Sequence, residues 1–102
     1  MKTYISGPIT GNPNYREDFA NAEAVLNLNG FRTANPTRFT LFGRDLEHYP
    51  WGICMAVCLW HLLWCPRIYM LHGWDSSRGA TIEHRFARFF NKMVVYQLKY
   101  EY

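Results

Sequence analysis

The chain has 102 residues, which is enough for one domain and no more, so we expect residues 1–102 to form a single domain. Apolar residues make up 49% of the chain and aromatic residues 18%, which predicts a packed core and argues against disorder. The net charge of +3 mildly favours anionic ligands, but the sequence has no run of lysine or arginine, so a nucleic-acid polymer is not expected as a partner.

Strand-like and helix-like segments alternate along the chain. Apolar periodicity defines the segments, and turn residues such as Gly30, a natural stop for the first helix, separate them. The predicted strands cover 1–6, 31–34, 67–71 and 93–98, the predicted helices cover 15–29, 51–64 and 79–91, residues 37–50 look irregular, and 99–102 carry no clear pattern. This alternation predicts an α/β protein with a parallel sheet of about four to five strands.

The second predicted helix is apolar on all sides. Between Ile53 and Leu63 its one strongly polar residue is His61. The run is too short to span a bilayer, and a helix of this kind must be covered on more than one side. Since a domain of this size has few ways to cover it alone, we expect the helix around Trp51–Trp64 to form the interface of a homodimer or a higher homo-oligomer.

The three cysteines are Cys54, Cys58 and Cys65, and an odd count without paired spacing argues against a disulfide framework. Cys54, Cys58 and His61 could form a metal face on the helix, but small apolar core residues are the simpler interpretation, so no metal is expected. Because a strand-like segment follows Lys2 directly, no signal peptide is recognised, and we expect a cytoplasmic location with no membrane partner.

Three loops follow the carboxyl ends of the predicted strands, and they begin at Gly7, Asn35 and His72. In an open parallel sheet the crossovers are right-handed, and ligands bind outside the carboxyl ends of the strands. We therefore expect the loops that begin at Gly7 and His72, which both contain glycine, to face one crevice.

Glu83 is the candidate catalytic group. It lies on the first turn of the third predicted helix, four residues after Gly79 and three after Ala80. These small neighbours share its helix face and leave room for a ligand beside the carboxylate. The alternative is a solvent-facing glutamate that offsets the helix dipole.

The start of the same helix is a candidate anion site. Ser76, Ser77 and Gly79 can offer hydroxyl and backbone N–H groups at the helix N-terminus. Arg78 can add a charge-assisted contact to a phosphate. The alternative is ordinary helix capping by Ser77 or Asp75.

Aromatic and histidine side chains complete the set of candidates. Tyr4 lies on the first predicted strand, and if it is in the core its hydroxyl needs a partner. His72 is better placed near the crevice than His84, which is adjacent to Glu83 but points elsewhere on the helix. Trp74, on the same loop as His72, can stack on a base or simply pack the loop down.

The order of these motifs resembles the nucleoside deoxyribosyltransferase-like superfamily, and within it a small bacterial and phage branch of uncharacterised, DUF4406-like domains. The resemblance spans nearly the whole chain, and the ordered set is more specific than any single piece. The matching residues are Tyr4 to Pro8, Thr10, Gly11, Asn35, Pro36, Cys65, Gly73, Trp74, Ser77, Gly79, Ala80 and Glu83.

The resemblance implies a flavodoxin-like or Rossmann-like three-layer sandwich. It also implies cleavage, by hydrolysis or base transfer, of the N-glycosidic bond of a (deoxy)nucleoside or its 5′-monophosphate, without a cofactor. Glu83 would attack the anomeric carbon with net retention, and Tyr4 would orient Glu83 or the sugar. The expected substrate-binding residues are Gly7, Pro8, Thr10, Asn35, His72, Trp74, Ser77, Arg78 and Gly79. Ser77 and Gly79 would hold the 5′-phosphate, and the superfamily commonly completes its sites across a dimer.

One departure from the family pattern concerns the proton donor. The pattern has an aspartate in the second helix where this chain has Cys58, and the aspartate of a Cys-Asp pair is replaced by Pro66. Protonation of the leaving base would come from Asp75, His72, Asp45 or a neighbouring subunit, and we expect Asp75 in the catalytic set. Because loss of a general acid typically costs about a hundredfold or more, a weakly catalytic nucleotide- or sugar-phosphate-binding module is the alternative function, with a phage-type accessory interaction protein as a third.

Overall fold

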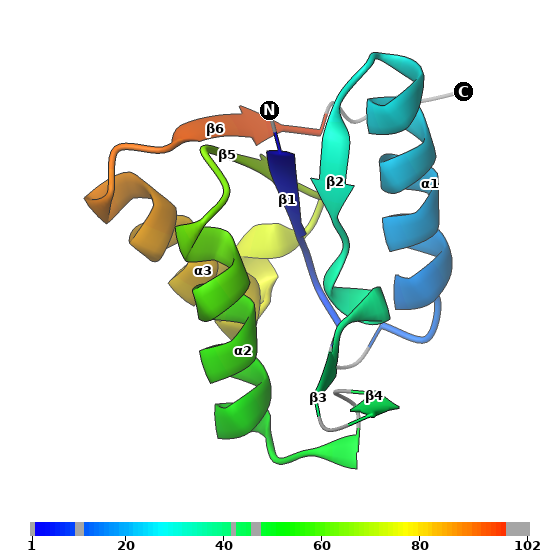
Figure 1. Cartoon of the computed structure of the whole chain (residues 1–102), viewed down its shortest axis with the longest axis vertical. Helices are drawn as coiled ribbons and strands as arrows, with labels where there is room; N and C mark the ends of the chain where they lie inside the picture. The colour runs from blue at the N-terminus through cyan, green and yellow to red at the C-terminus, as the bar shows by residue number, and fades with distance from the viewer. Residues whose placement is uncertain (1, 10–11, 42, 46–47, 98–102) are drawn as a thin grey trace.

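The computed structural model describes residues 2–9, 12–41, 43–45 and 48–97 (Figure 1). The helices are α1 (Tyr15–Leu28), α2 (Trp51–Leu63) and α3 (Arg78–Phe89), with short 3₁₀ helices η1 (Pro36–Arg38) and η3 (Trp74–Ser76). The strands are β1 (Lys2–Ser6), β2 (Arg32–Ala34), β3 (Thr40–Leu41), β4 (Arg44–Asp45), β5 (Arg67–Met70) and β6 (Met93–Tyr96). Within the described residues, the ends of the predicted helices and main strands differ from these bounds by two residues or fewer.

Four strands form one parallel sheet in the order β2-β1-β5-β6. Tyr4 of β1 is in register with Ala34 of β2 and with Ile68 of β5. Helix α1 packs on one face of the sheet, and α2 and α3 pack on the other (Figure 1). The chain therefore folds as the predicted Rossmann- or flavodoxin-like three-layer α/β sandwich, with four strands in its parallel sheet.

Residues of β1 alternate between the two faces because successive side chains of a strand point in opposite directions. Ile5 packs against α1 in an apolar cluster that contains Phe19 and Leu26. Tyr4 points to the other face, into the cluster that contains Cys58 of α2 and Ala80 of α3. Strand β1 thus contributes to both apolar clusters.

The segment 37–50, predicted to be irregular, contains more structure than expected. It includes the end of η1 and the antiparallel β3–β4 hairpin. Each strand of this hairpin has two residues, too few to give a periodic pattern. The turn uses Gly43, whose φ of +79° lies in the left-handed region that favours glycine.

No helix in the described part of the chain combines the length and the apolar character that a bilayer span requires. The apolar helix α2 has 13 residues, of which only Cys58 and Leu62 are buried. Its remaining apolar side chains are partly or largely exposed.

Candidate functional site

A cavity of about 660 Å³ lies at the carboxyl end of β1. Its walls come from β1, the start of α1, η1, β4, the first half of α2 and the start of α3. The loop that begins at Gly7 and the loop that begins at His72 both contribute residues to it, so the predicted convergence of these two loops is confirmed.

Glu83 lines this cavity and is 6% exposed, so it is not the solvent-facing glutamate of the alternative interpretation. Its Oε1 accepts a hydrogen bond of 2.7 Å from the Ser6 hydroxyl. Its Oε2 accepts a hydrogen bond from the Tyr4 hydroxyl, which gives that buried phenol the partner it needs. Both carboxylate oxygens are therefore held by neutral donors of β1.

This arrangement follows from the periodicity of β1 and the start of α3. Tyr4 and Ser6 are two residues apart on a strand, so both face α3. Helix α3 begins at Arg78, one residue earlier than predicted, and Glu83 is its sixth residue, so Glu83 lies on the second turn and not on the first as expected. A Cβ at Gly79 would lie 3.2 Å from the Met55 Sδ, so glycine at this position permits the close approach of α3 to α2.

Burial dominates the electrostatics of the site. Desolvation raises the pKa of Glu83 to about 7, although the hydrogen bonds from Tyr4 and Ser6 act in the opposite direction. Burial also raises the pKa of Tyr4 well above 10, with the neighbouring Glu83 as the next cause. Burial and then Glu83 raise the pKa of the Cys58 thiol to about 12. The carboxyl group of Glu83 thus changes its charge near neutral pH, whereas its neighbours Tyr4 and Cys58 stay neutral there.

The start of α3 forms one end of the cavity. The Ser77 side chain accepts a hydrogen bond of 3.4 Å from the Ala80 N–H, so Ser77 caps the helix, as the alternative interpretation has it. Ser76, Ser77, Arg78 and Gly79 all line the cavity, and capping does not remove them from it. The Arg78 guanidinium carbon lies 4.5 Å from the centroid of the Trp51 ring, so a positive charge is held over the cavity wall.

Three predicted site residues of the loop after β5 are not among the residues that line the cavity. Asp75 and His72 are exposed, and the His72 N–H donates to the Gln97 Oε1 at 2.9 Å. The Trp74 ring stacks on the His84 ring with centroids 4.3 Å apart and an interplanar angle of 24°. Of the two interpretations of Trp74, this contact supports the one in which it packs the loop down.

The predicted site residues of the loop after β1 differ in their relation to the cavity. Gly7 lines the cavity, and a Cβ there would lie 2.7 Å from the Leu71 Cβ, so only glycine fits without a shift. Pro8 is half-buried beside Gly73 and is not part of the cavity lining. Thr10 lies outside the described residues.

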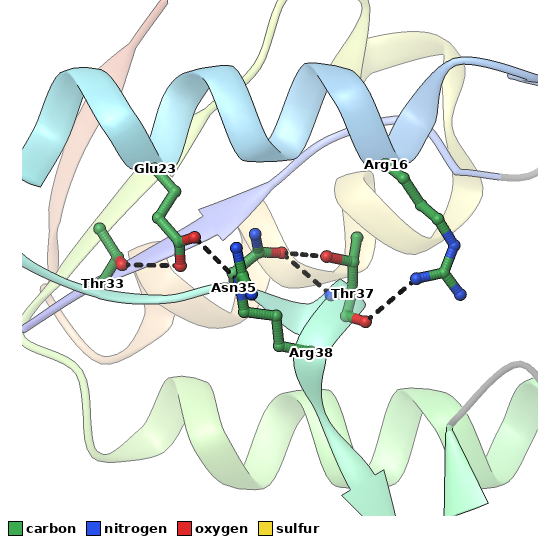
Figure 2. Close-up of polar contacts among 6 residues, drawn as sticks. All are labelled: Arg16, Glu23, Thr33, Asn35, Thr37 and Arg38. Carbon is green, nitrogen blue, oxygen red and sulfur yellow. Dashed lines mark hydrogen bonds and ion pairs between the residues drawn. The ribbon is translucent and has the colours of Figure 1, made fainter.

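Asn35 is buried, and its side chain caps the 3₁₀ helix η1 that follows it. Its Oδ1 accepts hydrogen bonds from the Thr37 N–H at 3.0 Å and from the Thr37 hydroxyl at 2.7 Å (Figure 2). The Arg16 Nη1 donates to the Thr37 carbonyl at 3.5 Å, and Arg38 and Thr33 both contact Glu23 of α1 (Figure 2). This network ties η1 to α1, and Thr37 is the member that Asn35 places at the cavity wall.

Sequence reasoning did not include Ser6 among the site residues. The alternation along β1 could have found it, because a residue two positions from Tyr4 must share its face. The cavity residues Tyr15, Tyr49 and Met55 were also missed, and no motif marks them.

The structure does not assemble the metal face that Cys54, Cys58 and His61 could have formed. The His61 ring stacks on the Phe39 ring with centroids 3.9 Å apart, whereas Cys54 and Cys58 line the cavity. Among the described residues, no three or more His, Cys, Asp or Glu side chains are grouped in a way that could hold a metal ion.

The fold and the cavity define a Rossmann- or flavodoxin-like α/β protein with a buried, hydroxyl-bound glutamate at the carboxyl end of strand β1. The chain belongs to the family described as "Domain of unknown function (DUF4406)", whose model matches residues 1–96. The comparison with curated proteins gave no match.

Proposed function

We propose that this protein cleaves the N-glycosidic bond of a nucleoside 5′-monophosphate with Glu83 as the nucleophile, and that its family belongs with the nucleoside deoxyribosyltransferase-like enzymes. The observation that carries the proposal is the pairing of both Glu83 oxygens with hydroxyl donors beside a cavity of about 660 Å³. Hydrogen bonds to both oxygens fix the orientation of the carboxylate. A nucleophile with a fixed orientation reacts faster with a bound substrate than one that rotates freely.

The reaction needs two displacements at one carbon. A Glu83 oxygen attacks C1′ of the sugar, the C1′–N bond breaks, and the base leaves with the electron pair of that bond and takes up a proton. Water then attacks C1′, loses a proton and releases Glu83 as a carboxylate, so the configuration at C1′ is retained. A second base in place of water would give transfer instead of hydrolysis.

The start of α3 supports a phosphate on the substrate. Ser76, Ser77 and Gly79 line the cavity at the positive end of a 12-residue helix. Arg78 lines it as well and can pair with a phosphate oxygen. The phosphate would hold the nucleotide so that C1′ meets Glu83.

A nucleotide-binding module with little turnover is the second candidate, and Cys58 favours it. The thiol lies in the cavity wall next to Tyr4 and Glu83, with a pKa of about 12. So weak an acid is poorly matched to protonating a leaving base near neutral pH. The module would bind the same nucleotides in the same cavity without releasing the base.

The test is base release, followed by chromatography, from ribo- and deoxyribonucleosides and their 5′-monophosphates. We expect release by the parent chain and none by Glu83→Gln, with Glu17→Gln, an exposed carboxylate on α1, as the charge-matched control. Release that survives in Glu83→Gln would overturn the role of Glu83. Binding without release from any compound would favour the binding module, and neither binding nor release would reject both candidates.

We also propose that the protein forms a homodimer through α2. Trp60 and Trp64 of this helix are 60% and 68% exposed, and their rings meet edge to face at 5.7 Å. Exposed apolar clusters of this kind are typical of interfaces. Light scattering should give twice the chain mass for the parent, and a lower mass for Trp60→Glu. A parent that stays monomeric at micromolar concentration would contradict the proposal and revive a foreign partner for α2.

A further inference from the structure

The β3–β4 hairpin brings a second carboxylate to the cavity. Asp45 ends β4, where its backbone pairs with Thr40 across the hairpin. Its side chain is exposed and belongs to the cavity lining. Glu83 and Asp45 are the two acidic residues among the described residues that line the cavity. No hydrogen bond or ion pair engages the Asp45 side chain within the described part of the chain.

The two carboxylates occupy different parts of the cavity. Glu83 is buried beneath β1, whereas Asp45 is exposed on the hairpin. Figure 1 shows the hairpin beyond the carboxyl ends of β1 and β2, with the first turns of α2 to its left. A nucleotide with its phosphate at the start of α3 and its C1′ at Glu83 has one part left to place, which is the base. Tyr15 and Tyr49 line the cavity and give it aromatic surface that suits a flat ring.

We propose that Asp45 selects the base, by accepting a hydrogen bond from an exocyclic amino group. This inference rests on the proposed function, because it uses the position of the nucleotide defined there. An ionised carboxylate only accepts hydrogen bonds. It therefore favours cytosine over uracil and adenine over hypoxanthine, since each second member has a carbonyl oxygen in place of the amino group. That oxygen would direct its lone pairs at the carboxylate.

Asp45→Asn is the informative substitution because the amide has nearly the same shape and can both donate and accept. It removes the preference without removing the side chain. Because Asp45 is exposed and water competes for its oxygens, we expect a preference of about tenfold, well below that of a fully buried recognition group.

The experiment measures binding and turnover with two matched pairs of nucleotides, CMP with UMP and AMP with IMP, as ribo and 2′-deoxy forms. Binding is measured by calorimetry in Glu83→Gln, which holds the substrate without turnover, with and without Asp45→Asn. Base release is measured in the parent chain, in Asp45→Asn and in the Glu17→Gln control.

We expect the amino-bearing member of each pair to bind about tenfold more tightly and to give the higher kcat/KM. Asp45→Asn should bring both ratios within about twofold, and Glu17→Gln should leave them unchanged. Turnover with equal ratios in the parent, or with ratios that persist in Asp45→Asn, would overturn the role of Asp45 and leave the proposed function standing. Failure of every nucleotide to bind and to react would overturn both.

Discussion

The two faces of the central sheet differ in what they do with the same strand. On the α1 side, Ile5 of β1 packs into an apolar cluster with Phe19 and Leu26. On the side of α2 and α3, Tyr4 and Ser6 of the same strand hold an ionisable group, Glu83. Successive residues of β1 therefore serve stability and the site in turn, and the two contributions can be separated by face.

The difference also has an energetic side. Burial of apolar groups on the α1 side favours the folded state. Burial of Glu83 on the other side disfavours its charged form, which is why its pKa is raised to about 7. The site is thus kept at a cost in stability that appears only when Glu83 ionises.

The strongest test of this contrast removes both hydroxyls that hold Glu83. The double variant Tyr4→Phe/Ser6→Ala leaves the carboxylate without its donors, so we expect base release to fall by about a thousandfold near neutral pH. Steady-state kinetics measure the loss. The single variant Tyr4→Phe should also move the ascending limb of the pH–rate profile above pH 7, because one donor that lowers the pKa of Glu83 is gone. An unchanged profile would contradict the account.

The next test concerns stability against pH. The pKa of Glu83 is higher in the folded state than in the unfolded state. The stabilisation that the folded state gains from protonated Glu83 is therefore fully present below about pH 4.5, and it is lost as the pH rises through about 7. Between these limits the parent should lose about 3 kcal/mol of unfolding free energy relative to Glu83→Gln, as urea unfolding measures. Burial lowers the pKa of His61 and His84, so these two residues make the unfolding free energy rise with pH. They do so in both proteins, and the difference in unfolding free energy between the parent and Glu83→Gln therefore reports on Glu83 alone. A difference that does not change with pH would show that Glu83 ionises as freely as in water.

A substitution on the α1 side of the sheet should lower the unfolding free energy and leave the activity nearly unchanged. Ile5→Val removes one methylene group from a fully buried side chain between Tyr4 and Ser6. We expect a loss of about 1 kcal/mol in unfolding free energy with kcat/KM within about twofold of the parent. Urea unfolding and kinetics on the same preparation check both halves. A large loss of activity at unchanged stability would mean that the faces are not separable.

The smallest effect is expected in the loop after β5. Asp75 is exposed and does not line the cavity, although the sequence suggested a catalytic role. Asp75→Asn should change base release by less than about twofold, in the same assay. A loss of tenfold or more would return Asp75 to the site and place the ligand outside the cavity described above.

The sequence predicted the main strands and helices because they are long enough to show apolar periodicity and are separated by glycine and proline. It missed the β3–β4 hairpin because two-residue strands have no period. It placed Gly7 and the start of the third helix, with Ser77 and Glu83, near one crevice because strand ends of a parallel sheet converge. The family resemblance added Tyr4, and the cavity contains all four.

The sequence could not distinguish residues that line the cavity from residues that hold the lining in place. Asn35 and Trp74 belong to the second kind, because the former binds Thr37 and the latter stacks on His84. Such contacts depend on tertiary packing, and a loop sequence does not contain that information. Ser6, by contrast, was available from the alternation of β1.

The most direct test of the central claim is to trap the intermediate on Glu83. A nucleoside 5′-monophosphate with fluorine at the 2′ position reacts slowly at C1′, so a glycosyl-enzyme should accumulate and can be located by peptide mass spectrometry. The account predicts a sugar-phosphate adduct on the peptide that contains Glu83, formed with one equivalent of released base and absent in Glu83→Gln. Release of base without any adduct, or with an adduct on another residue, would contradict it.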